Sequence, residues 1–135
     1  HPTAMQVLYA CKGADRVVLI TDAVRVAGFA DGEYQKDDNR VVVVKDGAVR
    51  LPDGTLSGST LTMDRALRNF IQATGEPLAR VWQASSLNAA RSIHIADRKG
   101  SLEVGKDADI VLVDEDINVY LTMAEGRVVY RAEAE

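Results

Sequence analysis

The chain has 135 residues, of which 47% are hydrophobic and 27% charged, and its formal net charge is −4. This composition is typical of one soluble globular domain. The negative charge and the scattered basic residues argue against nucleic acid and against an anionic membrane surface as partners. No apolar run approaches the roughly 20 residues that a membrane helix needs. A single cysteine, Cys11, excludes an internal disulfide and suits a cytoplasmic location.

A helix followed by a buried strand is predicted at the start of the chain. Residues 3–12 place Ala4, Val7, Leu8 and Cys11 on one helical face, and Gly13 favours an end there. This position favours a buried, inert thiol over a nucleophile. Residues 16–20 form an apolar, valine-rich run, which is typical of a strand buried in a parallel sheet. Together they make one step of a parallel α/β fold.

The next part of the chain is predicted to contain a long loop and a β-hairpin. Residues 23–38 carry the turn signals Gly28 and Asp31-Gly32 and are expected to form a loop. Two valine-rich segments, 41–44 and 48–51, flank Asp46-Gly47, which favours a tight hairpin turn.

Three helices and a small sheet are predicted in the remainder. Ser59 or Thr60 is expected to cap the first helix, Pro77 to open the second, with Trp82 in the core, and Asn88 to cap the third. The expected strands are residues 109–113, 117–123 and 128–130. Two or three antiparallel strands need a partner layer to be stable.

Asp22 is the candidate for acid/base chemistry. It follows the predicted strand 16–20, and catalytic groups gather at the carboxyl ends of strands in parallel α/β folds. A carboxylate there can take a proton from water and give it to a leaving nitrogen. On position alone, a turn or capping role for this aspartate is the stronger interpretation.

The other candidate sites are weaker. Backbone N–H groups of Gly58-Ser59-Thr60 could bind a polar ligand at the start of a helix, but ordinary helix capping is favoured. The two histidines, His1 and His94, have no His, Cys or carboxylate at metal-ligand spacing, so a surface or packing role is favoured.

Five segments resemble the C-terminal portion of N-acetylglucosamine-6-phosphate deacetylases in the amidohydrolase superfamily. They are residues 19–23, 32–34, 54–64, 84–90 and 99–109. Residues 99–109 are shared across the superfamily. The Gly-Ser-Thr-Leu-Thr-Met segment, at its spacing after Thr-Asp-Ala, is more specific to the sugar-phosphate deacetylases.

The resemblance implies an α/β fold in which residues 1–98 are the C-terminal segment of a TIM-type (β/α)8 barrel. Residues 99–135 would be strands of a small β-sandwich. It also implies hydrolysis of N-acetylglucosamine 6-phosphate to glucosamine 6-phosphate and acetate. Asp22 would act as acid/base on a metal-bound water and protonate the departing amine. Leu56, Ser57 and Gly58 would line the sugar pocket.

The resemblance places the metal ligands, a glutamate and two histidines, upstream of this chain. The parent enzyme is expected to use a divalent metal such as zinc and to be a cytoplasmic homo-oligomer, whereas these 135 residues alone are expected to bind no metal and to be inactive. Two alternatives stay open. One is another amidohydrolase, such as a cyclic amidase or a deacetylase of a different N-acyl substrate. The other is a non-catalytic fragment that associates with itself.

Overall fold

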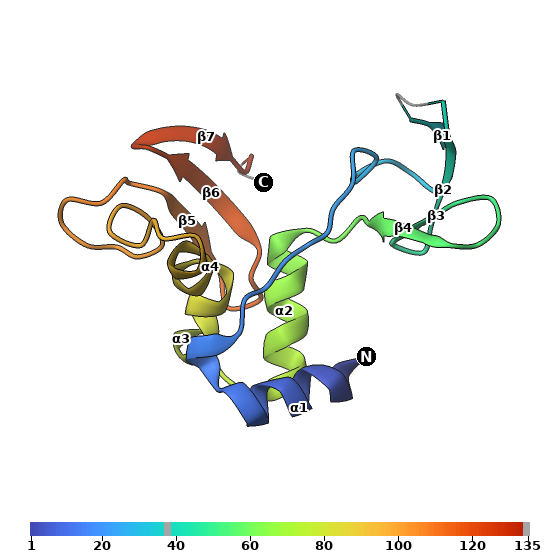
Figure 1. Ribbon diagram of the computed structural model, residues 1–135. Coiled ribbons are helices and arrows are strands. Elements are labelled where there is room, and N and C mark those ends of the chain that lie inside the picture. Colours follow the sequence, from blue (N-terminus) through green and yellow to red (C-terminus); the bar gives the residue numbers. More distant parts are fainter. Residues whose placement is uncertain (37–38, 134–135) are drawn as a thin grey trace. The chain divides into compact units, whose positions relative to one another are not determined.

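The computed structural model describes residues 1–36 and 39–133 and contains helices and two antiparallel sheets (Figure 1). The chain divides into two compact units. The first comprises residues 1–19 and 64–135, and the second comprises residues 20–63.

The helices α1 to α4 belong mainly to the first unit. Their bounds are Pro2–Lys12, Met63–Thr74, Leu78–Val81 and Leu87–Ser92. Two short 3-10 turns, Ala14–Arg16 and Trp82–Ser85, lie between them in sequence. The predicted helix over residues 3–12 is confirmed, and it ends at Gly13, whose φ of 69° suits a residue without a side chain.

The core of the first unit gathers around α2. Phe70 is 1% exposed and makes an edge-to-face contact with Tyr9 of α1, with 5.8 Å between the ring centroids. The buried side chains of this core are Val17, Leu67, Phe70, Val81, Ala84 and Ile117. The strong apolar face of α2 follows the helical spacing of its sequence, as expected.

A three-stranded antiparallel sheet completes the first unit. Its strands, in the order β5-β6-β7, are Ile110–Val113, Val119–Ala124 and Arg127–Arg131, so the strands expected near the C-terminus are confirmed. Lys99 holds the loop before β5 together, because its Nζ lies 2.6 Å from an oxygen of Asp109 and 2.9 Å from one of Asp107, and it lies 3.7 Å from Oε1 of Glu125 in the turn between β6 and β7. The hydrogen bond to Asp109 raises the pKa of Lys99.

The second unit is built on a four-stranded antiparallel sheet in the order β1-β2-β3-β4 (Figure 1). The strands are Gly32–Gln35, Val41–Lys45, Ala48–Arg50 and Leu56–Ser59. The predicted hairpin is confirmed as β2 and β3, with Asp46 and Gly47 at φ of 50° and 75° in the turn. Val26, Val42, Val44 and Val49 form the small core beneath the sheet.

Three expectations for the backbone are wrong. Residues 17–20 lie in no strand of the described structure, because a strand needs a hydrogen-bonded neighbour and an apolar run does not provide one. The expected loop over residues 23–38 contains β1; residues 37 and 38 of it lie outside the described part. Residues 58 and 59 belong to β4, which pairs with β3, so they do not open a helix.

Three expectations for side chains are also wrong. Cys11 is exposed, because the apolar face of α1 is only partly covered in this chain. Trp82 is 36% exposed, since it lies in a 3-10 turn where the helical spacing no longer applies. Asn88 is a buried residue inside α4, where its side chain binds backbone carbonyls remote in sequence.

The barrel, the sandwich and the division into residues 1–98 and 99–135 concern a longer fold and stay predictions; residues 134 and 135 lie outside the described part. Among the residues that the structure describes, none of the helices combines the length and the apolar character that crossing a membrane requires.

Candidate active site

Asp22 has an unusual backbone conformation on an exposed segment. Its φ is 48°, in the left-handed region that residues other than glycine rarely adopt. The residue is exposed, and none of the described residues donates a hydrogen bond to its carboxylate. An exposed carboxylate held in a disfavoured backbone conformation is a candidate functional group, because surrounding contacts must maintain that conformation.

The end of β4 provides those contacts. The backbone N–H of Ser59 donates to the carbonyl oxygen of Asp22 at 3.0 Å, and the N–H of Val24 donates to the carbonyl of Ser59 at 3.1 Å. These bonds form an isolated parallel bridge between Ala23 and Ser59. The segment that carries Asp22 therefore lies directly beside the last residue of β4.

Gly58 makes this close approach possible. Its φ is 105°, and a Cβ atom at this position would lie 2.4 Å from Cγ1 of Val24 and 3.2 Å from the carbonyl oxygen of Asp22. The first distance requires the Val24 side chain or its backbone to shift, and the second requires the Asp22 carbonyl to give way by a few tenths of an ångström. The structure thus brings Asp22 and Gly58, two residues singled out in the sequence, into contact.

Leu56 and Ser57 precede Gly58 on the same strand. Leu56 pairs with Arg50 of β3 and is 62% exposed, whereas Ser57 is half-buried. Side chains alternate along a strand, so Leu56 and Ser57 face opposite sides of β4. The four predicted site residues are therefore Asp22 itself and three residues of the strand beside it.

Ser59 is a contact residue whose role the sequence reasoning missed. Its hydroxyl donates to the carbonyl oxygen of Thr21 and accepts a hydrogen bond from the backbone N–H of Leu61 at 3.1 Å. In the sequence Ser59 has the pattern of a helix cap, but it ends β4, and the helix begins only four residues later, at Met63. The signal that could have indicated this contact is the fixed spacing between the Thr-Asp-Ala and Gly-Ser motifs, because both belong to the resemblance to sugar-phosphate deacetylases.

The chain does not provide a metal site in its described part. Within residues 1–36 and 39–133, no group of three or more His, Cys, Asp or Glu side chains is placed to hold a metal ion. His1 accepts a hydrogen bond from the N–H of Thr3 at the start of α1, and His94 is exposed after α4. The described residues therefore do not fit a metal centre.

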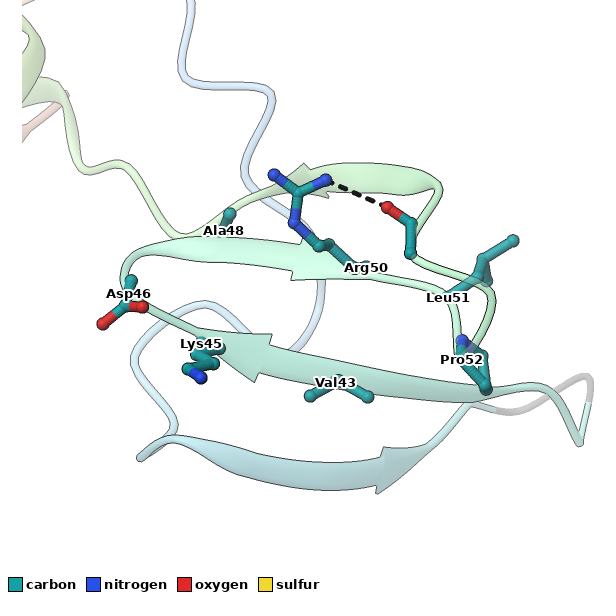
Figure 2. Close-up of a pocket in the computed structure, with 8 residues that line it drawn as sticks. Val43, Lys45, Asp46, Ala48, Arg50, Leu51 and Pro52 are labelled. Carbon is teal, nitrogen blue, oxygen red and sulfur yellow. Dashed lines mark hydrogen bonds between the residues drawn. The ribbon is translucent and has the colours of Figure 1, made fainter.

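A hollow on the β2–β3 sheet does not coincide with the candidate site. Figure 2 shows Lys45, Asp46 and Arg50 among its lining residues, and Arg50 donates to the carbonyl of Gly54 at 3.0 Å. Asp22 and the residues of β4 are not part of its lining. The hollow is lined by residues of β2, β3 and the turn that follows β3, so it is separate from the Asp22 segment.

The chain matches a known protein family over most of its length. The model of the amidohydrolase family aligns with residues 15–129. The chain belongs to the amidohydrolase family.

Two curated amidohydrolase relatives and one solved structure illustrate the similarity. N-acetylglucosamine-6-phosphate deacetylase of Lysinibacillus sphaericus is 43% identical over 95% of this chain and 33% of its own length. A putative N-acetylgalactosamine-6-phosphate deacetylase of Escherichia coli K12 is 39% identical over 94% of this chain and 75% of its own length. The crystal structure of the Thermotoga maritima N-acetylglucosamine-6-phosphate deacetylase is 41% identical, covers 97% of this chain and 36% of its own, and has a TM-score of 0.87.

The resemblance to N-acetylglucosamine-6-phosphate deacetylases predicted from the sequence is confirmed. This amidohydrolase chain spans about a third of the length of the Lysinibacillus relative and of the Thermotoga structure.

Proposed function

We propose that these residues form the acid/base part of a deacetylase that hydrolyses N-acetylglucosamine 6-phosphate to glucosamine 6-phosphate and acetate. The observation that carries the proposal is the contact between the Asp22 segment and Gly58-Ser59 at the end of β4. The two sequence motifs that resemble the sugar-phosphate deacetylases meet at that contact. The 43% identity with a deacetylase of this name supports the choice of reaction.

Asp22 is proposed to act as general base and then as general acid. Its carboxylate takes a proton from the attacking water while the water oxygen bonds to the acetamide carbonyl carbon. The same proton then passes to the amine nitrogen as the carbon–nitrogen bond breaks, which leaves acetate and the free amino sugar. An exposed carboxylate can serve both steps because none of the described residues donates a hydrogen bond to it.

Leu56, Ser57 and Gly58 are proposed to line the sugar pocket beside this carboxylate. A strand end beside a catalytic group can orient a sugar through backbone groups, and positioning of this kind accounts for a large share of enzymatic rate enhancement. Gly58 suits such a place because it lets another backbone come close.

A divalent metal, zinc in the first instance, is proposed for the longer protein, with ligands from residues outside this chain. Amidohydrolases are generally metal-dependent, which supports this proposal. We further propose a TIM-type barrel with a β-sandwich, a homo-oligomeric state and a cytoplasmic location. The TM-score of 0.87 supports the barrel and sandwich. Sedimentation of the longer protein tests the oligomeric state.

The substrate is tested by acetate release from a longer protein that contains these residues and an upstream barrel. Three substrates are compared at equal concentration: N-acetylglucosamine 6-phosphate, N-acetylgalactosamine 6-phosphate and unphosphorylated N-acetylglucosamine. We expect the highest kcat/KM with the first. Preference for the galactosamine compound would favour a second candidate function, deacetylation of N-acetylgalactosamine 6-phosphate. The 39% identity with the Escherichia coli relative supports this alternative. No release from any of the three would contradict the proposed function.

A further inference from the structure

We propose that Ser59 is a positioning residue for Asp22, acting through the backbone on both sides of the carboxylate. This inference rests on the proposed function, because it assigns Ser59 a part in the same reaction. Ser59 is half-buried at the end of β4, and its hydroxyl is hydrogen-bonded to the main chain.

Ser59 forms hydrogen bonds to Asp22 and to residues on both sides of it in the sequence. The hydroxyl of Ser59 donates to the carbonyl of Thr21, the residue before Asp22. The backbone N–H of Ser59 donates to the carbonyl of Asp22 itself at 3.0 Å. The carbonyl of Ser59 accepts from the N–H of Val24, two residues after Asp22, at 3.1 Å. One residue thus fixes the main chain before, at and after the carboxylate.

These contacts account for the backbone conformation of Asp22. A left-handed conformation, here with φ of 48°, is disfavoured for a residue with a side chain and persists only where neighbouring contacts maintain it. The conformation at this residue decides the direction in which the carboxylate leaves the chain. The contacts with Ser59 therefore set that direction.

The hydroxyl is the part of Ser59 that a substitution can test. Any residue other than proline at position 59 could make the two backbone hydrogen bonds, whereas the bond to the Thr21 carbonyl requires a side-chain donor. The same hydroxyl accepts from the N–H of Leu61 at 3.1 Å, so it also holds the chain that leaves β4. Threonine carries the same hydroxyl, and alanine removes it with little change in volume.

The test measures acetate release from N-acetylglucosamine 6-phosphate by the longer protein and its Ser59→Ala, Ser59→Thr, Ser59→Cys and Asp22→Asn variants. We expect Ser59→Ala to lower kcat by about tenfold to 100-fold, because a small misplacement of a catalytic group has effects of this size. KM should stay within about twofold, since Ser59 orients the base and does not bind the sugar. Ser59→Thr should restore kcat to within about threefold. If Ser59→Ala does not fold, Ser59→Cys, which keeps the size but donates weakly, should show the same loss.

Ser92→Ala is the matched control. Ser92 is exposed on α4, and its hydroxyl also donates to a backbone carbonyl, that of Ala89, at 2.7 Å. This variant should keep the native kcat. Native kcat in Ser59→Ala, or a loss that appears only in KM, would overturn the role of Ser59 while leaving the proposed function intact. A loss of kcat that threonine does not restore would also overturn it. Absence of turnover in the native protein would overturn the proposed function, and the role of Ser59 with it.

Discussion

Gly58 is a glycine whose surroundings leave little room for a side chain. A side chain there would meet Cγ1 of Val24 at 2.4 Å and the carbonyl oxygen of Asp22 at 3.2 Å. Gly54 also has a positive φ, of 88°, but nothing lies within 4 Å of the position where its Cβ would be. The two glycines therefore separate the effect of backbone strain from the effect of crowding on the Asp22 segment.

Gly58→Ala is expected to destabilise the protein by about 1–3 kcal/mol more than Gly54→Ala, because only the former adds a clash to the unfavourable φ. Urea unfolding of the two variants and the native protein measures the difference. Gly58→Ala should also lower acetate release, since relief of the clash displaces the backbone of Asp22. Equal stability of the two variants would show that Val24 moves away freely.

At the scale of the element, α4 is held by a side chain that the sequence pattern did not single out for the core. Asn88 is 4% exposed, and its Nδ2 donates to the carbonyls of Ala14 and Val17 at 2.7 and 2.8 Å. These bonds attach α4 to the segment that leads toward Asp22. The N–H of Leu19 donates to the carbonyl of Ala84 at 2.8 Å and holds the same segment.

Asn88→Ala is expected to lower the free energy of unfolding by about 2–4 kcal/mol, because it leaves two carbonyls without their donor and opens a small cavity. Urea unfolding measures the change. Asn69→Ala is the control, since Asn69 is an exposed residue of α2 and its replacement should change stability by no more than about 0.5 kcal/mol. A loss of similar size in both variants would contradict the role given to Asn88.

The turn between β5 and β6 depends on a charged side chain. Oδ1 of Asp114 accepts from the N–H groups of Asp116 and Asn118 at 3.0 and 2.8 Å, and Oδ2 accepts from Nδ2 of Asn118 at 2.8 Å. The hydrogen bond from the Asn118 side chain, followed by that from its backbone, lowers the pKa of Asp114 in the folded chain. A lowered pKa means that the folded state binds this proton less readily than the unfolded state.

Asp114→Asn is therefore expected to be less stable than the native protein at pH 7. The contribution of Asp114 is fully present above its unfolded pKa, about 3.9, and is lost as the pH falls through the lower folded pKa. Urea midpoints at pH 7 and pH 3 should show a larger difference between native and variant at pH 7. Glu115→Gln, at an exposed neighbour, is the control. A difference that does not shrink at pH 3 would contradict this account.

Elements with local causes could be predicted from the sequence. The apolar spacing of α2 and the Asp46-Gly47 turn of the β2–β3 hairpin are properties of adjacent residues, and both appear as expected. The strand character of β4 could not be seen, because it depends on pairing with β3. The burial of Asn88 likewise depends on carbonyls more than seventy residues away in sequence.

In the candidate site, too, local motifs could be predicted and contacts between distant residues could not. Asp22 and Gly58 were singled out by motif, and the structure brings them together. The contribution of Ser59 was not foreseen, because its hydroxyl binds Thr21, which is 38 residues away in the sequence. Motif spacing indicates which residues belong to a site, whereas the hydrogen bonds between distant segments decide how they are oriented.

At the scale of the whole molecule, the chain carries one part of a larger proposed site. It spans about a third of the length of the Lysinibacillus and Thermotoga deacetylases. Val111, Leu112 and Val129 of the β5–β7 sheet are all more than half exposed. Their exposure is consistent with further chain covering this sheet, as the proposed β-sandwich requires. The proposed reaction likewise needs metal ligands that the described residues do not supply.

The most direct test of this account is the rate of acetate release from N-acetylglucosamine 6-phosphate by the longer protein, native and Asp22→Asn, with zinc added. Asparagine has the size of aspartate and tolerates the left-handed conformation, so the variant should fold as the native protein does. We expect its kcat to fall by about 10²- to 10⁴-fold, because the amide cannot carry the proton from water to the leaving nitrogen. A native rate in Asp22→Asn would contradict the assignment of Asp22 as the acid/base.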